Sequence, residues 1–133
     1  MGNTIQRISF EDVQYAQSNQ YVIISTLPTK EQDMLILKTV PCDHEITAVE
    51  NAIRAKTPII IYGKHANDES VYVKYKQIKK LGGVVYVYPG GLFEWLLLQD
   101  IYGNEFATTS SVKIVDLLKY KPHNVLNIKY ITY

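Results

Sequence analysis

Apolar runs and segments with helical spacing alternate along most of the chain. The strongest runs span residues 21–26 (YVIIST), 59–62 (IIIY) and 84–88 (VVYVY). Unbroken apolar runs of this length are typical of strands that are covered on both faces of a sheet. We therefore expect each of these three segments to be a buried strand.

Two further strands are expected from weaker patterns. One is residues 4–8, and the other is residues 34–40 (MLILKTV), which Pro41 ends. The C-terminal tail, residues 123–133, also alternates like a strand. The tail could pair at a sheet edge, fold over the body of the protein, or meet a partner.

Helices are predicted between the strands from apolar side chains three and four residues apart. The first begins after Ser9, where Asp12 completes a capping box, and the second runs from an N-cap at Asp43 to about Ala55. The third begins at Asp68 and ends at the glycine pair 82–83. The side chains expected to face inward are Phe10, Val13, Ala16, Ile46, Val49, Ile53, Val71, Tyr75, Ile78 and Leu81.

Two more helices are expected after the last strong strand. Residues 92–103 (LFEWLLLQDIYG) are apolar on nearly every side, which predicts a deeply packed helix or helical turn with Trp95 in the core. Residues 109–121 predict a final helix with Ile114, Leu117 and Leu118 inward, stopped by Pro122.

This alternation of strands and helices indicates one α/β domain with a mostly parallel sheet and helices on both faces. The chain has 133 residues, of which 47% are hydrophobic and 20% charged, as in an ordinary globular domain. We expect the domain to span residues 1–122, followed by the tail at 123–133.

Charge and cysteine content narrow the function classes. A formal net charge of +1 argues against strong attraction to nucleic acid or anionic membranes. No apolar run approaches the length of a membrane span, and the N-terminus lacks a signal-peptide core. Cys42 is the sole cysteine, so no internal disulfide can form. These features favour a reducing, cytoplasmic setting.

The segment from Val85 to Trp95 has the pattern V-x-x-x-x-GG-x-x-x-W and follows Gly83. Together with the strand, loop and helix before it, this pattern resembles the second half of a rhodanese-like domain. The residues that carry the likeness are Gly83, Val85, Gly90, Gly91 and Trp95, and the likeness covers roughly residues 5–98. The opening ISFEDV is similar to the family's first strand and helix. The resemblance implies a three-layer α/β/α fold with a five-stranded, mostly parallel sheet in the order 1-5-4-2-3.

The loop after the strand at residues 59–62 departs from that family. Gly63 stands where the family has its nucleophilic cysteine, and Glu69 stands where the phosphatase branch has a phosphate-binding arginine. An acidic-basic pair usual in the family is also missing, because residues 25–27 are Ser, Thr and Leu. The expected chemistry needs a thiolate held by backbone N–H groups at a helix N-terminus, and Gly63 offers none.

The carboxylates at the end of this loop add to the difference. Asp68 and Glu69 are expected at the first turn of the next helix, where they cap it and oppose an entering anion. Repulsion at close range costs on the order of a few kcal/mol. The degenerate loop consists of Gly63, Lys64, His65, Ala66, Asn67, Asp68 and Glu69. We expect it to cap the helix, with no catalytic residue and no cofactor.

Other sites have weaker support in the sequence. Cys42 follows a predicted strand and has His44 nearby, so a relocated nucleophile is an alternative. A metal site of Cys42, His44 and His65 lacks the usual ligand spacing. The lysines at 74, 76, 79 and 80 fit a solvated helix face better than a nucleic-acid site.

The sequence therefore predicts a catalytically inactive rhodanese-like domain that serves as a protein-interaction or structural module. Its expected contact surface is the loop at residues 64–70 or the tail at 125–133. A further likeness, to compact rhodanese-like proteins of large DNA viruses, implies contact with a virion or host protein. The alternatives are a sulfurtransferase or phosphatase that uses Cys42, and a small-anion binder at the Gly63 loop.

Overall fold

One parallel sheet organises the fold. The computed structural model describes residues 5–109. Its strands are β1 (Val22–Ser25), β2 (Thr39–Val40), β3 (Ile59–Tyr62) and β4 (Val85–Tyr88). They pair in the order β2-β1-β3-β4. The predicted α/β class with a parallel sheet is confirmed, as are the three strong strands.

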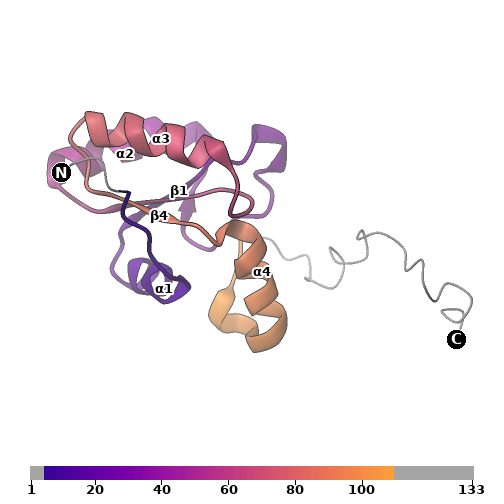
Figure 1. Ribbon diagram of the computed structural model, residues 1–133. Coiled ribbons are helices and arrows are strands. Elements are labelled where there is room, and N and C mark those ends of the chain that lie inside the picture. The colour runs from indigo at the N-terminus through magenta and orange to yellow at the C-terminus, as the bar shows by residue number, and fades with distance from the viewer. Residues whose placement is uncertain (1–4, 110–133) are drawn as a thin grey trace, which may run out of the picture.

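Within the described residues, four α-helices cover the sheet on both faces. They are α1 (Phe10–Ser18), α2 (Glu45–Ala55), α3 (Glu69–Lys80) and α4 (Gly91–Tyr102). Short 3-10 helices lie at Thr29–Glu31 (η1), Cys42–His44 (η2) and Gly103–Phe106 (η3). Helices α2 and α3 lie on one face, with α1 and α4 on the other (Figure 1).

Each face of the sheet has its own apolar core. Along β3, Ile59 and Ile61 pack under α2 and α3, whereas Ile60 and Tyr62 pack against the α1 and α4 side. All four side chains are buried because both faces of the strand are covered. Residues 59–62 are all apolar in the sequence because every side chain of β3 faces one of these two cores.

The predicted fifth strand, at residues 4–8, is not a strand in the described part of the chain. Arg7 forms a single parallel bridge with Val87. The Ile8 N–H donates to the Val87 carbonyl (2.8 Å), and the Val87 N–H donates to the Gln6 carbonyl (2.9 Å). The segment stops there because the Ser9 N–H donates to Asp12 Oδ2 (3.1 Å) in the capping box of α1. It therefore lies beside β4, the position of the first strand in the expected order, without extending the sheet fully.

The predicted strand at residues 34–40 is also shorter than expected, since β2 covers just Thr39–Val40. Lys38 has a positive φ of 80°, which turns the chain before the strand begins. Ile36 forms an antiparallel bridge with Thr108, and the Leu37 N–H donates to the Ala107 carbonyl (3.0 Å). The apolar run is therefore used to bind the chain that follows α4.

A buried hydroxyl fixes this turn to the sheet. Tyr62 is fully buried, and its hydroxyl oxygen accepts from the Ile36 N–H (3.0 Å) and pairs with Thr39 Oγ1 (2.8 Å). Burial raises the pKa of Tyr62 well above its usual range, so the neutral phenol is the form present.

Replacing Tyr62 by phenylalanine is expected to lower the free energy of unfolding by about 1–2 kcal/mol, because the buried Ile36 N–H loses its partner. Urea unfolding measures the change. Tyr72→Phe is the matched control: that half-buried ring lies under Arg7, and its loss of a hydroxyl should cost less than about 0.5 kcal/mol. Equal costs for the two variants would contradict the role given to the Tyr62 hydroxyl.

Most predicted helix ends agree with the structure, and one is wrong. Asp68 caps α3, and Gly82, with φ 96°, follows its last turn. Helix α2, however, starts at Glu45 with His44 as N-cap, and Asp43 lies inside η2. The His44 N–H donates to the Pro41 carbonyl (2.9 Å), so a 3-10 turn takes up the residues predicted to cap the helix.

The inward faces of the helices are confirmed with exceptions at their ends. Val13, Ala16, Val49, Val71, Tyr75 and Ile78 are buried, while Phe10 and Ile53 are half-buried. Ile46 and Leu81 are exposed, contrary to prediction. Ile46 lies in the first turn of α2, and Leu81 is the C-cap of α3.

Helix α4 is present, but the prediction that it is deeply packed is wrong. Trp95 is fully buried, as expected, whereas Phe93, Leu97 and Ile101 are exposed. A single face of the helix packs on the sheet, so its other apolar side chains face outward.

The predicted helix at residues 109–121, the domain end at residue 122 and the tail at residues 123–133 lie outside the described residues, apart from Thr109. Among residues 5–109, no helix has the length and apolar character needed to cross a membrane.

Candidate functional site

The loop predicted to hold the degenerate site joins β3 to α3. It leaves the sheet at Gly63, beside the C-terminal end of β1, and enters α3 through Asp68. This junction is where parallel α/β folds commonly bind ligands. Gly63 is buried, whereas the four residues from Lys64 to Asn67 are exposed.

The Asp68 carboxylate accepts hydrogen bonds from both ends of the loop. Oδ1 accepts from the Ser70 N–H (3.1 Å) and from the Ser70 hydroxyl. Oδ2 accepts from the Lys64 N–H (3.2 Å) and from the Thr26 hydroxyl (3.4 Å). Backbone N–H groups at a helix N-terminus are those that bind anions elsewhere. Here one such group, the Ser70 N–H, and one loop group, the Lys64 N–H, bind a carboxylate of the chain itself.

These hydrogen bonds keep the Asp68 carboxylate ionised. Partial burial raises its pKa, but the hydrogen bonds from Ser70, Lys64 and Thr26 lower it, and the net pKa lies below the ordinary aspartate value. A negative charge is therefore fixed inside the loop at neutral pH. A second anion would meet this charge and would have to displace it from the N–H groups.

The depressed pKa of Asp68 predicts a stability that depends on pH. Its contribution is fully present above the unfolded-state pKa of about 3.9 and is lost as the pH falls through the folded-state value. The Asp68→Asn variant should therefore lose less stability than the wild type when acidified below about pH 4. Urea unfolding across an acidic pH series measures this.

Asp33→Asn is the matched control, since the Asp33 side chain is exposed. Its pH dependence should match that of the wild type. If Asp68→Asn also follows the wild-type curve, the carboxylate does not stabilise the loop.

Gly63 has no room for a side chain in this arrangement. A Cβ atom added there would lie 2.4 Å from Asp68 Oδ2 and 2.7 Å from Val71 Cγ2. Such distances are far inside van der Waals contact. The space that a side chain at position 63 would fill is thus taken by the carboxylate of Asp68 and the buried side chain of Val71.

The double-glycine turn packs directly on the loop. Gly91 has φ 65°, and a Cβ atom there would lie 2.6 Å from the Gly63 carbonyl oxygen. The same carbonyl accepts from the Leu92 N–H (2.9 Å), and the Lys64 carbonyl accepts from the Phe93 N–H (2.9 Å). The N-terminus of α4 is therefore capped by the loop, which explains physically why a glycine stands at position 91.

The remaining loop residues do not gather around a reacting centre. Lys64 Nζ lies 3.0 Å from Glu31 Oε1, and His65 Nδ1 accepts from the Asn67 N–H (3.3 Å). Glu69 is exposed and lines a shallow hollow with Arg7 and Tyr72. The prediction that Asp68 and Glu69 begin the helix is confirmed. Of these two carboxylates, the Asp68 carboxylate is the one that accepts hydrogen bonds from the loop.

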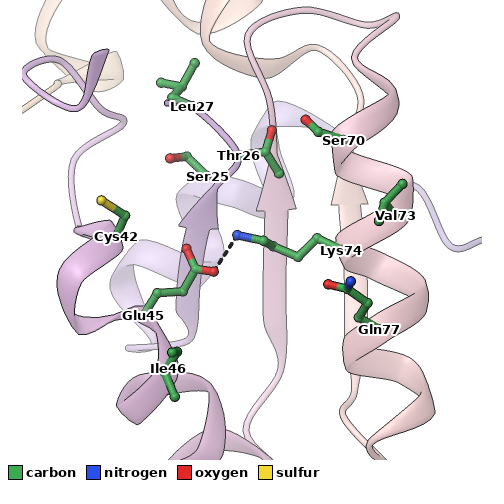
Figure 2. Close-up of a pocket in the computed structure, with 10 residues that line it drawn as sticks. All are labelled: Ser25, Thr26, Leu27, Cys42, Glu45, Ile46, Ser70, Val73, Lys74 and Gln77. Carbon is green, nitrogen blue, oxygen red and sulfur yellow. Dashed lines mark hydrogen bonds and ion pairs between the residues drawn. The ribbon is translucent and has the colours of Figure 1, made fainter. Parts of the chain in front are cut away.

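Cys42 lies on η2, at the edge of a pocket of about 460 Å³. Figure 2 shows the pocket between α2 and α3, with Lys74 reaching across it to an ion pair with Glu45. Hydroxyl groups of Ser25, Thr26 and Ser70 also line it. Sequence reasoning missed this pocket. Lys74 is the pocket residue that could have pointed to it. Its ion pair with Glu45 could not be predicted, because the sequence does not show that α2 and α3 are neighbours.

Within residues 5–109, Cys42 forms no hydrogen bond with His44 or His65. Cys42 Sγ lies 3.8 Å from the Thr29 hydroxyl, and His44 is exposed with Nε2 4.0 Å from Asp43 Oδ2. His65 belongs to the separate Gly63 loop. Within residues 5–109, no group of three or more His, Cys, Asp or Glu side chains could hold a metal ion.

The lysine row of α3 is not uniform. Lys74 is half-buried in its ion pair, and Lys79 Nζ lies 5.9 Å from the centre of the Tyr75 ring. Lys76 and Lys80 are exposed. Two of the four charges thus have partners within the domain, which weakens the face as a phosphate-binding surface.

No protein-family model matches the sequence, and no curated protein matches it either. Solved structures do match. The Alr3790 protein from Anabaena sp. is 15% identical with a TM-score of 0.57, over 84% of this chain and 87% of that chain. The full-length protein from Lactobacillus plantarum is 16% identical with a TM-score of 0.52, over 70% and 82%. At these identities the likeness shows the fold alone: an α/β domain with a parallel sheet.

Proposed function

We propose that this chain is a catalytically inactive rhodanese-like domain that works as a protein-interaction or structural module. One observation carries the proposal: the Asp68 carboxylate accepts the loop N–H groups of Lys64 and Ser70, beside a Gly63 that has no space for a side chain. In the family that the sequence resembles, those two positions belong to the bound anion and the nucleophile.

The chemistry of that family cannot start from this loop. Sulfur transfer or phosphate hydrolysis needs a thiolate stabilised by N–H groups and by the helix dipole. Gly63 supplies no thiol, and the N–H groups already bind a carboxylate. An entering anion would be repelled by Asp68 at a cost on the order of a few kcal/mol.

The loop is better suited to contact another protein. Residues 64–67 are all exposed and stand between two fixed points, the buried Gly63 and the capping Asp68. A rigid, exposed loop loses little conformational entropy on binding. The viral likeness of the sequence makes a virion or host protein the class of partner that we expect.

Turnover assays test the absence of catalysis. Purified protein is incubated with thiosulfate and cyanide, and separately with an aryl phosphate, alongside the Cys42→Ser variant. We expect no turnover above background in either protein. Turnover that Cys42→Ser abolishes would overturn the proposal.

Affinity capture from the native source tests the interaction surface. We expect Lys64→Ala/His65→Ala to lose the main bound protein. Lys76→Ala/Lys80→Ala is the control, because it removes two exposed side chains from the middle and end of α3. Loss of the partner with both variants, or with neither, would count against the loop as the contact surface.

The pocket beside Cys42 favours one second candidate, an enzyme that uses this thiol. Its hydroxyl groups and the Lys74–Glu45 pair would surround a small ligand there. The activating base is the weak point of this candidate, because His44 is exposed and lies beside Asp43. The Cys42→Ser arm of the turnover assay decides between the two candidates.

A further inference from the structure

A small pocket of about 280 Å³ lies beside α1, on the face of the sheet that this helix covers. Three tyrosines line it: Tyr15 from α1, Tyr21 from the position before β1, and Tyr86 from β4. The ring centres of Tyr15 and Tyr21 lie 5.8 Å apart, and their planes are inclined by 69°. Differently oriented aromatic rings therefore form much of its wall. We call it the tyrosine pocket.

Apolar side chains complete the lining of the tyrosine pocket. Ile60 of β3 is buried at its base, and Ile8 and Pro58 lie beside it. Pro58 directly precedes β3, whereas Gly63 directly follows that strand. The tyrosine pocket therefore lies toward the opposite end of β3 from the Gly63 loop, and its chemistry is separate from that of the loop.

Asp12 gives the tyrosine pocket a negative charge. Its exposed carboxylate lines the pocket, and the described residues that share the lining include no lysine, arginine or histidine. Arg7 turns to the other face of the sheet, where its guanidinium lies 5.8 Å from the centre of the Tyr72 ring of α3 (Figure 1). The N-terminus of α1 carries a partial positive charge of about half a unit, which the carboxylates of Glu11 and Asp12 in its first turn outweigh. The local field thus favours a cation.

The hydrogen-bond acceptors of the tyrosine pocket decide which kind of cation fits. Asp12 Oδ2 already accepts from the Ser9 N–H (3.1 Å) and from the Ser9 hydroxyl (3.3 Å). A primary ammonium carries three N–H donors, and each of them needs an acceptor once it leaves water. A quaternary ammonium carries none, and both aromatic rings and a carboxylate attract it through charge alone. A lining of three phenol rings, aliphatic carbon and one carboxylate suits the quaternary group.

We propose that the tyrosine pocket binds a quaternary ammonium group, the chemistry shared by choline and trimethylated lysine. The methyl groups pack on the aliphatic base while the charge lies among the rings and near Asp12. The volume of about 280 Å³ suits such a head group, because drug-sized ligands occupy pockets of roughly 300–1,000 Å³. The proposal goes beyond the proposed function and is independent of it, because it involves neither Gly63 nor Asp68.

An NMR titration of the full-length, ¹⁵N-labelled protein with choline chloride tests this proposal, with sodium chloride at equal concentration as the ionic-strength control. A second titration uses the neutral tert-butyl analogue of choline, in which a carbon atom replaces the nitrogen. We expect choline to shift the amide resonances of Tyr15, Tyr21 and Tyr86 in a saturable manner. The analogue should bind roughly tenfold more weakly, because it has the same shape and lacks the charge.

A matched pair of variants tests the contribution of one ring. Tyr15→Leu keeps an apolar side chain and should weaken choline binding about fivefold. Tyr102→Leu is the control, because Tyr102 on α4 is 61% exposed against 59% for Tyr15 and likewise lies near one other ring, that of Phe106. Its affinity for choline should equal that of the wild type. The amide spectrum of each variant without ligand confirms that it is folded.

A titration with N-acetyl-trimethyllysine amide distinguishes the two sources of the group. Binding tighter than that of choline supports the proposal with a protein side chain as the ligand, and weaker binding supports it with a free small molecule. Equal affinities for choline and its neutral analogue would overturn the proposal, and this comparison depends on no variant. The absence of saturable shifts at the three tyrosines, or an unchanged affinity in folded Tyr15→Leu, would also overturn it.

Discussion

Replacing Trp95 by alanine is expected to lower the free energy of unfolding by about 3–5 kcal/mol, the largest effect of any single change considered. Its side chain is fully buried and meets Phe106 edge-on, with ring centres 5.0 Å apart. The ring of Tyr88 lies 6.3 Å away in a similar geometry. Alanine would leave a cavity among these rings and would remove the hydrogen bond from Nε1 to the Ala107 carbonyl.

Guanidinium unfolding measures this loss, with two comparison variants. Trp95→Phe retains an aromatic ring but loses the donor to Ala107, so an intermediate cost of about 1–3 kcal/mol is expected. Ile46→Ala removes a side chain that is 75% exposed and should change stability by less than about 0.5 kcal/mol. A cost for Trp95→Ala near that of Ile46→Ala would mean that α4 does not pack on the sheet as described.

Introducing a thiol at the end of β3 by Gly63→Cys is expected to destabilise the protein by about 3 kcal/mol and to create no sulfurtransferase activity. The new Cβ atom would lie 2.4 Å from Asp68 Oδ2. Asp68 could move away only by losing its hydrogen bonds to Lys64 and Ser70, which include the cap of α3. Val71, buried and branched at Cβ, has little freedom to move.

A double-mutant cycle with Asp68→Ala separates the clash from other effects. If the carboxylate causes the strain, Gly63→Cys should cost less in the Asp68→Ala background, and the coupling should exceed about 0.5 kcal/mol. Urea unfolding gives the four stabilities, and a thiosulfate–cyanide assay follows each protein. Additive costs would contradict the contact between positions 63 and 68. Turnover by Gly63→Cys alone would show that the loop still accepts an anion.

Local patterns in the sequence were sufficient for much of the fold. Three apolar runs became β1, β3 and β4, because each is covered on both faces by helices. The capping box at Ser9 and the cap at Asp68 were readable because such hydrogen bonds join residues a few positions apart.

The failures share a different cause, which is contact between distant segments. The run at residues 34–40 has the composition of a strand, but Ile36 binds Tyr62 and the chain near Thr108. The residues next to Ile36 in the sequence do not indicate these distant partners. Helix α4 was expected to be buried because it is apolar all round, yet the described residues cover just the side that bears Trp95.

The candidate site was predictable in its chemistry but not in its geometry. The absence of a thiol at Gly63 and the carboxylates at Asp68 and Glu69 could be read directly. The backbone conformation of the loop decides which carboxylate turns inward. Asp68 accepts from the Lys64 N–H, whereas Glu69 lines a different hollow. The Lys74–Glu45 pair depends on the packing of α2 beside α3 in the same way.

We infer that Asp68 occupies the place in the loop where an anion would otherwise bind. An NMR titration of the full-length, ¹⁵N-labelled protein with thiosulfate and with phosphate, at constant pH and ionic strength, decides whether this claim holds. We predict that the amide resonances of Lys64 and Ser70 stay in place, because both N–H groups already donate to the Asp68 carboxylate. Saturable shifts of these two resonances would show that the loop binds anions and would contradict the claim.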